Sequence, residues 1–169
     1  MNQPARAPFA PLRSLDDAMA ELLAHAQPLL PAEPVSTFDA DGRVLAQDVV
    51  SALQVPAVDN SSMDGYAVRC ADVVTAGVVL PVSQRIAAGM DGAPLQPGTA
   101  ARIFTGAPVP AGADAIVMQE DCVAVDGGAV RINAVPPTGQ WIRRAGEDVR
   151  LGASVLQAGM RLAPGALGL

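Results

Sequence analysis

A polar loop between two apolar runs carries the densest group of reactive side chains in this chain. The stretch 59–69 holds the only tyrosine, two carboxylates and two serine hydroxyls. Binding and catalytic groups concentrate on loops held by a rigid scaffold. Ser61 and Ser62 can hydrogen-bond the local backbone, and Gly65 permits a sharp turn with positive φ, which would leave Asp64 facing outward. A well-capped turn with no chemical role also accounts for these residues.

A second candidate is the uncharged turn 105–112, which follows an expected strand. Its prolines fix φ, and its glycines, including Gly106, permit the close approach of a ligand. The Thr105 hydroxyl and nearby backbone N–H groups could hold an anionic oxygen. The alternative is a rigid turn stiffened by proline.

A third candidate places two arginines beside two carboxylates around a glycine, in the stretch 143–148. Arg143 and Arg144 suit phosphate recognition, and Asp148 suits metal binding. The alternative is a solvated cluster whose charges pair with one another.

Short elements must position these loops. Ser14 is expected to cap a helix over 15–27 that has one apolar face, with Asp17 completing a capping box. A short helix is expected over 42–46, and Pro164 is expected to begin a last helical turn. Strands are expected at 35–38, 48–55, 66–69, 78–87, 99–104, 115–119, 122–125, 129–133, 154–156 and 160–162, with a hairpin turn at 126–128 and the last two strands paired. This pattern predicts a mostly β fold with a few short helices, built as a small barrel or sandwich.

The composition narrows the possible functions. The chain has 169 residues and a formal net charge of −6, which argues against a nucleic-acid surface. All 11 basic residues are arginines, so the sequence contains no Schiff-base lysine and no P-loop lysine. Two isolated cysteines, a start without a signal peptide and the lack of a long apolar run predict a cytoplasmic protein without a membrane segment.

Three motifs in the chain resemble those of one family. They are Ser61-Ser62-Met63-Asp64-Gly65-Tyr66-Ala67, Arg102-Ile103-Phe104-Thr105-Gly106-Ala107-Pro108-Val109-Pro110 and Arg143-Arg144-Ala145-Gly146-Glu147-Asp148-Val149. In this order they resemble the molybdopterin molybdenumtransferase (MoeA) family, which includes the E region of gephyrin. The resemblance runs from about residue 14 to the end. Ser62 departs from the usual alanine, and Val58 stands where phenylalanine is common.

The resemblance implies an architecture. A β-rich domain over 53–139 would be inserted into a small α+β domain formed by 14–52 and 140–169, after a disordered start over 1–13. The family's following α/β substrate domain and its C-terminal β domain are absent from this sequence. The chain would therefore be the N-terminal part of an enzyme, and we expect it to be inactive alone.

The resemblance also implies a reaction and its partners. Members of the family insert molybdenum from molybdate into adenylated molybdopterin and release AMP, with a divalent cation, here expected to be Mg²⁺. They are usually homodimers. The molybdopterin adenylyltransferase and acceptor molybdoenzymes are further expected partners.

Site residues follow from the matched motifs. Asp64, Thr105 and Asp148 match positions in the family's cleft, with Asp64 and Asp148 holding hydrated Mg²⁺ and Thr105 positioning a substrate oxygen. Substrate-binding roles are expected for Ser61, Ser62, Gly106, Arg143 and Arg144.

A rival hypothesis is a non-catalytic dimerisation or partner-binding module on the same scaffold. The two hypotheses differ in whether Asp64, Thr105 and Asp148 converge in one pocket, because a plain scaffold has no reason to gather them. A carbohydrate-binding β module is disfavoured, because only 3% of the residues are aromatic.

Overall fold

The computed structural model describes residues 13–27 and 31–169, and its chain separates into two compact units. One unit ends at Ala40, and the other runs from Asp41 to Leu169. The expected disorder of 1–13 falls on residues that, apart from Arg13, lie outside the described part.

The first unit contains helix α1 (Leu15–Ala24), whose cap agrees with the sequence prediction. The Ser14 Oγ accepts a hydrogen bond from the Asp17 amide at 3.1 Å and donates one to the Asp17 carboxylate at 2.7 Å. The helix is shorter than predicted, because its last amides bond three residues back instead of four; His25 donates to the Leu22 carbonyl. No residue of α1 is buried, and Leu22 is 69% exposed.

The strand predicted over 35–38 is wrong. A 3₁₀ turn, η1 (Thr37–Asp39), stands there, with the Ser36 hydroxyl accepting from the Phe38 amide at 3.3 Å. Serine hydroxyls compete for backbone amides in this way and favour turns over strands.

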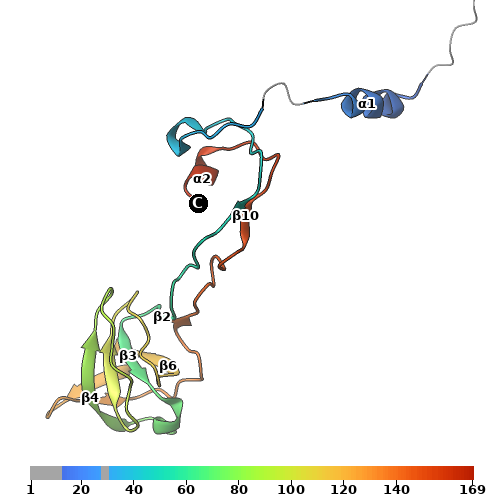
Figure 1. Cartoon of the computed structure of the whole chain (residues 1–169). Coiled ribbons are helices and arrows are strands. Elements are labelled where there is room, and N and C mark those ends of the chain that lie inside the picture. The colour runs from blue at the N-terminus through green and yellow to red at the C-terminus, as the bar shows by residue number, and fades with distance from the viewer. Residues whose placement is uncertain (1–12, 28–30) are drawn as a thin grey trace, which may run out of the picture. The chain divides into compact units, whose positions relative to one another are not determined.

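A six-stranded sheet dominates the second unit, in the order β6-β3-β5-β4-β8-β7 (Figure 1). Its strands are β3 (Gly65–Val68), β4 (Val78–Ile86), β5 (Ala100–Ile103), β6 (Ala115–Met118), β7 (Cys122–Val125) and β8 (Ala129–Ile132). The short 3₁₀ turns η2 (Cys70–Asp72) and η3 (Gln119–Asp121) follow β3 and β6. These strands lie within two residues of the predicted ranges.

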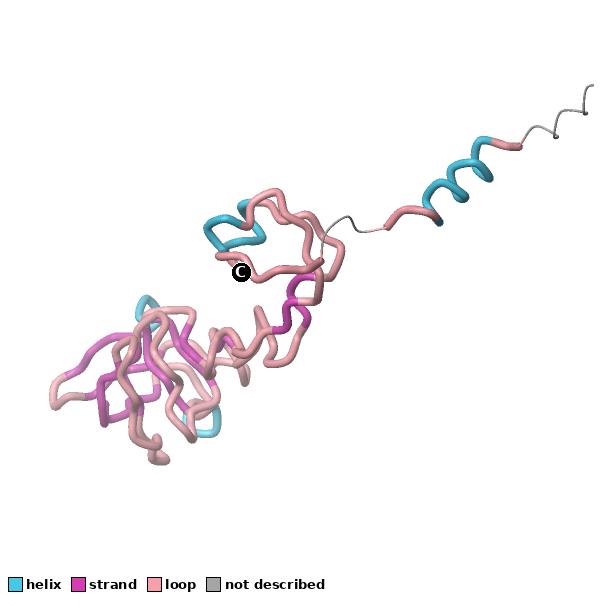
Figure 2. Tube along the Cα trace, turned by 45° about the horizontal axis from the view of Figure 1, so that its top comes forward, coloured by secondary structure: helices cyan, strands magenta, loops and turns pink. Residues whose placement is uncertain are grey.

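Strand β4 joins the two halves of this sheet. Its first residues pair with β8, as in Val78↔Ile132, and its last residues pair in parallel with β5, as in Ile86↔Ile103. The predicted turn 126–128 closes the β7–β8 hairpin, with positive φ at Gly127 and Gly128. The sheet curls into a half-barrel, and its strands are among the magenta segments of the Cα tube in Figure 2.

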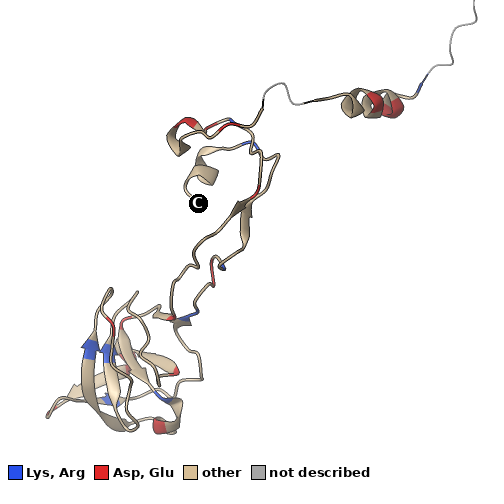
Figure 3. Ribbon diagram, in the orientation of Figure 1, with Lys and Arg blue, Asp and Glu red and all other residues tan. Residues whose placement is uncertain are grey.

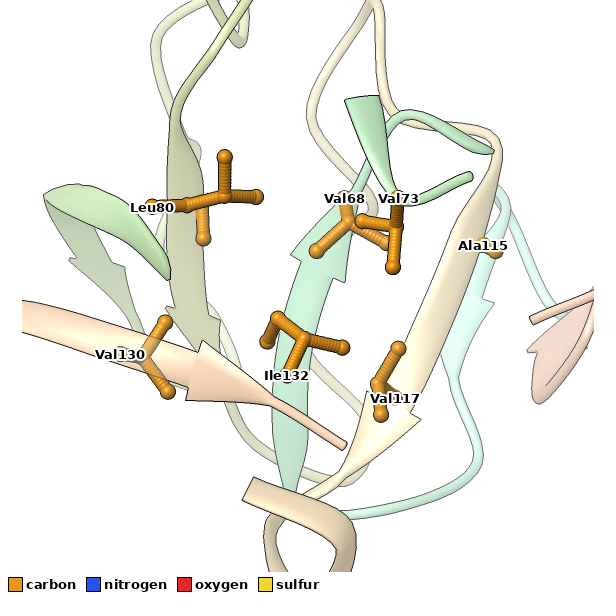
Figure 4. Packing of buried hydrophobic residues seen from close by; sticks show 8 residues of the cluster. Val68, Val73, Leu80, Ala115, Val117, Val130 and Ile132 are labelled. Atoms are coloured by element: carbon orange, nitrogen blue, oxygen red, sulfur yellow. The ribbon is translucent and has the colours of Figure 1, made fainter. Parts of the chain in front are cut away.

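The two faces of the sheet bury different side chains, as alternation along a strand requires. One cluster includes Val68, Val117, Val130 and Ile132 (Figure 4). The other cluster contains Ala67, Ile86, Leu95, Ala101, Ile103, Ala107 and Ile116, of which Ala67 and Ile116 alternate with Val68 and Val117 along their strands. Full burial of one such isoleucine or valine stabilises the fold by about 1.5–3 kcal/mol. This packing makes the sheet a rigid support for the loops at its ends.

Two flanking segments pair with each other outside the large sheet, and Figure 1 shows them running side by side. Strand β1 (Val49–Val50) pairs with β10 (Ser154–Leu156), and single bridges join Val44 to Arg161 and Val55 to Val149. The predicted pairing of 154–156 with 160–162 is therefore wrong, as is the helix predicted over 42–46. The segments 154–156 and 160–162 instead pair with the backbone of 43–51. For example, the Leu45 amide donates to the Met160 carbonyl at 2.9 Å.

A smaller pairing, β2 (Asn60–Ser61) with β9 (Ile142–Arg143), links the start of β3 to the late segment. Helix α2 (Pro164–Leu167) begins with proline, as predicted. The mostly β fold with short helices is confirmed, whereas the division at 53–139 stays a prediction. Within the described residues, no helix combines the length and apolar character needed to cross a membrane.

Candidate functional site

The Asp64 carboxylate is bound to Thr105 by two hydrogen bonds. The Thr105 backbone N–H and its hydroxyl both donate to Asp64 Oδ1, each at 2.8 Å. These bonds, from the amide and then from the hydroxyl, hold the pKa of Asp64 below its ordinary value, and the charge of Arg102 acts in the same direction. Asp64 is therefore ionised at neutral pH although its hydrogen-bonding partner is uncharged.

The sheet register explains why these two residues meet. β3 and β5 are antiparallel with Gly65 opposite Ile103, so the residue before β3 lies at the end of β5. Two further bonds join the same loops, from the Gly106 amide to the Ser61 carbonyl at 2.8 Å and from the Ser61 amide to the Ala107 carbonyl at 2.9 Å.

Gly65 serves this site in a different way from the one predicted. It lies in a strand and is not among the glycines with positive φ. A Cβ at Gly65 would overlap the backbone carbonyl of Val117 on β6. The glycine is therefore required by the close approach of two strands, while Gly106, with φ of 80°, supplies the left-handed turn after Thr105.

The two serines hold the loop that precedes Asp64. Ser61 is 1% exposed, and its hydroxyl donates to the Met63 carbonyl at 2.6 Å, as the expected local turn requires. The Ser62 hydroxyl donates to the Trp141 carbonyl at 3.0 Å, and the Ser62 amide donates to the same carbonyl. Ser62 thus ties the Asp64 loop to the segment that enters β9.

The first three amides of the turn after β5 are not free, although the sequence suggested this turn for anion binding. The Thr105 amide donates to Asp64, the Gly106 amide to Ser61 and the Ala107 amide to the Phe104 carbonyl. An anion at this turn would have to displace one of these bonds, so another group must supply donors to it.

A second cluster of charges follows β9, and its members pair with one another. Arg143 Nη2 lies 2.6 Å from both oxygens of Asp148, and Arg143 Nε lies 3.6 Å from Glu147. The hydrogen bond from Arg143 to Asp148 and the charge of this carboxylate raise the pKa of the Arg143 guanidinium. Asp148 also lines an open depression of about 440 Å³ with Glu147 and Arg150.

Arg144 is held by a carboxylate that the motif comparison did not single out. Its Nη1 lies 2.6 Å from Asp59 Oδ2, and the Ala145 amide donates to Asp59 Oδ1 at 2.8 Å. The Ala145 bond is the main reason why the pKa of Asp59 is lowered, with Arg144 adding to it and partial burial opposing it. Register alone could have indicated this residue, because Asp59 precedes β2 and Arg144 follows β9.

The β2–β9 pair lies between the Asp64 and Arg143 clusters. Asn60 is opposite Arg143, and the Asn60 Oδ1 is buried without a hydrogen-bond partner in the described part of the chain. The structure joins Asp64 to Thr105 and Asp148 to Arg143, but the described hydrogen bonds and ion pairs do not link Asp64 with Asp148. Their convergence in one cleft stays a prediction.

The two carboxylates differ in how well they fit Mg²⁺. Residues 13–27 and 31–169 contain no group of three or more His, Cys, Asp or Glu side chains arranged to hold a metal. Mg²⁺ commonly uses one or two carboxylates and completes its shell with water and substrate phosphate oxygens. Asp64 fits this mode, because both of its hydrogen bonds are on Oδ1 and Oδ2 remains available. Asp148 would first have to leave Arg143.

Arg102 is the residue at this site that sequence reasoning missed. From β5 its Nη1 donates to the Gly65 carbonyl at 2.9 Å, and its Nη2 donates to Gln119 Oε1 at 2.6 Å. Its guanidinium also lies 4.5 Å from the ring centre of Phe104 and 5.2 Å from that of Tyr66. From β5, Arg102 thereby connects the first residue of β3 to the residue after β6, beside the Asp64–Thr105 contact.

The thiols are poor candidates for a nucleophile. Burial raises the pKa of Cys122 to about 11, with the negative charge of Asp121 adding to it. Burial also raises the pKa of Cys70, and neither thiol is in a disulfide. Both are therefore protonated at neutral pH, which disfavours a role as nucleophile.

The sequence of this chain is similar to that of proteins of known type. The family model described as "MoeA N-terminal region (domain I and II)" matches residues 13–169. The chain is 48% identical over 160 residues to molybdopterin molybdenumtransferase 2 of Mycobacterium tuberculosis, covering 89% of this chain and 37% of the relative. It is 43% identical over 149 residues to molybdopterin molybdenumtransferase of Synechococcus elongatus, covering 84% and 36%. The chain thus spans little more than a third of the length of these relatives.

Solved structures of proteins from the same family are similar to this chain in fold. Two crystal structures of a molybdopterin biosynthesis MoeA protein from Pyrococcus horikoshii superpose with TM-scores of 0.74 and 0.78, at 34% and 30% identity. The first covers 80% of this chain and 37% of the solved chain, and the second covers 94% and 41%.

Proposed function

The chain belongs to the MoeA N-terminal region family, and from this premise we propose that it contributes to molybdenum insertion in molybdenum cofactor biosynthesis. The proposed reaction transfers molybdenum from molybdate to adenylated molybdopterin and releases AMP. The chain would act as the N-terminal part of a longer molybdopterin molybdenumtransferase. The names of the relatives support this activity, and the reaction itself is the proposal.

The observation that carries the proposal is the contact between Asp64 and Thr105. Their motifs are 41 residues apart in the sequence, and the sheet brings the two side chains to 2.8 Å. Thr105 can position a substrate oxygen if its hydroxyl turns its proton from Asp64 to that oxygen, while its amide keeps Asp64 oriented and ionised. A turn with only a structural role does not need a partly exposed, ionised carboxylate with one free oxygen.

Mg²⁺ is the proposed metal, with Asp64 Oδ2 as its ligand from the first cluster. When bound, it would offset phosphate charge as a Lewis acid. Asp148 is the second proposed ligand, provided that Arg143 releases it. A homodimer, the molybdopterin adenylyltransferase and acceptor molybdoenzymes are the proposed partners.

The test uses a chimaera, because this chain spans only part of its relatives. Residues 13–169 replace the matching region of the M. tuberculosis relative, and AMP release from adenylated molybdopterin is measured with molybdate and Mg²⁺. We expect activity within about tenfold of the parent, since the two sequences are 48% identical over this region. The isolated chain is expected to release no AMP.

Three variants in the chimaera test the site. Asp64→Asn and Thr105→Ala should lower the rate, and Asp126→Asn, in the exposed β7–β8 turn, is the matched control. A folded chimaera without activity, beside an active parent, contradicts the proposed function. Full activity of Asp64→Asn contradicts the proposed site.

A further inference from the structure

Two arginines lie side by side at the end of the sheet that carries Thr105. Arg85 on β4 is opposite Arg102 on β5 in the parallel register. Figure 3 shows basic segments next to each other on neighbouring strands of this sheet. The guanidinium carbons of Arg85 and Arg102 lie 4.4 Å and 4.5 Å from the ring centre of Phe104, the residue before Thr105.

Four arginines of the described chain are paired with carboxylates, whereas these two are not. Salt bridges with carboxylates hold Arg13, Arg69, Arg143 and Arg144. In the described part of the chain, neither Arg85 nor Arg102 has a carboxylate within salt-bridge distance. The hydrogen-bond acceptors of Arg102 are neutral, namely the Gly65 carbonyl and the Gln119 amide oxygen.

Placing two guanidinium groups against one ring is favourable for each group but not for the pair. The ring attracts each cation, while the two like charges repel each other. An anion that both groups could reach would relieve this repulsion. The chain carries a net charge of −6, and this pair of cations lies beside the candidate site.

The other donors expected to bind an anion near Thr105 are already used. The amides of Thr105, Gly106 and Ala107 donate within the chain, and carboxylates hold both Arg143 and Arg144. Donors still available at this end of the sheet include those of Arg85 and the remaining N–H groups of Arg102.

We propose that Arg85 and Arg102, held by Phe104, bind a tetrahedral oxyanion next to Thr105. The inference rests on the proposed function and names the groups that hold the anionic part of its substrate. A guanidinium is planar and presents several N–H donors in a fixed geometry that matches phosphate-like oxygens. Phe104 limits the orientations of both groups and so reduces the entropy lost on binding. The oxyanion is the phosphate of the nucleotide-bearing substrate or molybdate itself, since both are tetrahedral.

Binding can be measured on the full chain without any activity. The ¹⁵N-labelled protein is titrated with AMP, inorganic phosphate and molybdate, each at constant ionic strength, and the arginine Nε–Hε and Thr105 amide signals are followed by NMR. We expect one of these anions to shift the signals of Arg85 and Arg102 with a Kd on the order of 1 mM. AMP or phosphate as the tightest ligand identifies the phosphate source, and molybdate as the tightest identifies the metal substrate.

Matched variants separate a site from general charge attraction. Arg85→Gln should weaken binding about tenfold, because it removes charge-assisted hydrogen bonds but leaves the Gly65 contact of Arg102 intact. Arg85→Lys should restore part of the affinity, and Arg131→Gln, on β8, should leave it unchanged. Phe104→Leu should weaken binding by a smaller factor.

Several outcomes overturn the proposal: no shift with any of the three anions, shifts at Arg143 and Arg144 alone, or an equal loss of affinity in Arg131→Gln. Because the readout is binding, it is independent of the chimaera assay. An inactive chimaera with Arg85-dependent binding would contradict the proposed reaction and support the oxyanion site. An active chimaera without such binding would support the reaction and contradict the oxyanion site.

Discussion

Asp64 and Asp148 each follow one strand of the same two-stranded β2–β9 sheet, yet their surroundings differ. Asp64 is oriented by the neutral donors of Thr105, whereas both oxygens of Asp148 lie 2.6 Å from Arg143. Neutral donors lower the pKa of a carboxylate and leave its charge available, but a guanidinium compensates that charge directly. Two aspartates of equal standing in the sequence motifs therefore differ in how readily they can bind a cation.

The largest expected effect is on the rate of AMP release. Asp64→Asn keeps the oxygen that accepts from Thr105 and removes only the charge, so we expect the rate of the chimaera to fall about a hundredfold with little change in Tm. The resemblance implies a comparable loss for Asp148→Asn. If the rate of AMP release falls by less than about threefold in Asp148→Asn, the role of Asp148 is only to pair with Arg143.

Metal affinity is the next comparison. Mn²⁺ prefers the same oxygen ligands as Mg²⁺ and broadens nearby NMR signals, so a titration of the chain reports which carboxylate it approaches. We expect the Asp64 and Thr105 signals to broaden at about a tenfold lower Mn²⁺ concentration than the Asp148 signal. Arg143→Gln should reduce this difference, because it frees Asp148. Broadening of Asp148 first in the unmodified chain would reverse the comparison.

Acid sensitivity gives a smaller effect. The folded-state pKa values of Asp59 and Asp64 are lowered, so their contribution to stability is full above the unfolded pKa of about 4 and is lost as the pH falls through the folded values. Asp59→Asn and Asp64→Asn should therefore flatten the decrease of Tm between about pH 5 and pH 3. Thermal unfolding at several pH values checks this, with Asp126→Asn as the control. Parallel curves for all variants would mean that these hydrogen bonds do not persist in solution.

The smallest effect is on stability at neutral pH. The Arg143 and Asp148 side chains are 39% and 48% exposed, and ion pairs exposed to this degree contribute little to folding stability. Asp148→Asn should therefore change Tm by less than about 3 °C in thermal unfolding. A decrease several times larger would identify the pair as a structural element and weaken the case for a ligand role.

The positions of strands could be predicted from the sequence where alternation was clear. The strands with which they pair could not. The ranges of β7 and β8 and their turn were predicted closely, because glycine turn signals separate short apolar runs. The segment around Met160 has the same local signals as a hairpin strand, yet its backbone partners lie more than a hundred residues earlier. Local patterns cannot distinguish these outcomes, because pairing is decided by tertiary packing.

The same limit applies to the site. The motifs singled out Asp64 and Thr105, and their contact supports treating them as one site. Arg102 and Arg85 lie in strands and have the pattern of solvent-facing residues, so only the register between β4 and β5 indicates that they are neighbours. Similarly, a glycine in a polar loop predicts a turn, whereas Gly65 is required by the carbonyl of a strand that comes some fifty residues later.

The position of β3 between β5 and β6 has a consequence for the order of events during synthesis. Gly65 is paired with Met118, so β3 leaves the ribosome long before its second neighbour exists. At about 5–20 residues per second, the interval is roughly 3–10 seconds. During this time at least one edge of β3 is unpaired and open to association with other chains. The Asp64–Thr105 contact can form once β5 has emerged, but the strand that carries Asp64 is enclosed only when β6 follows.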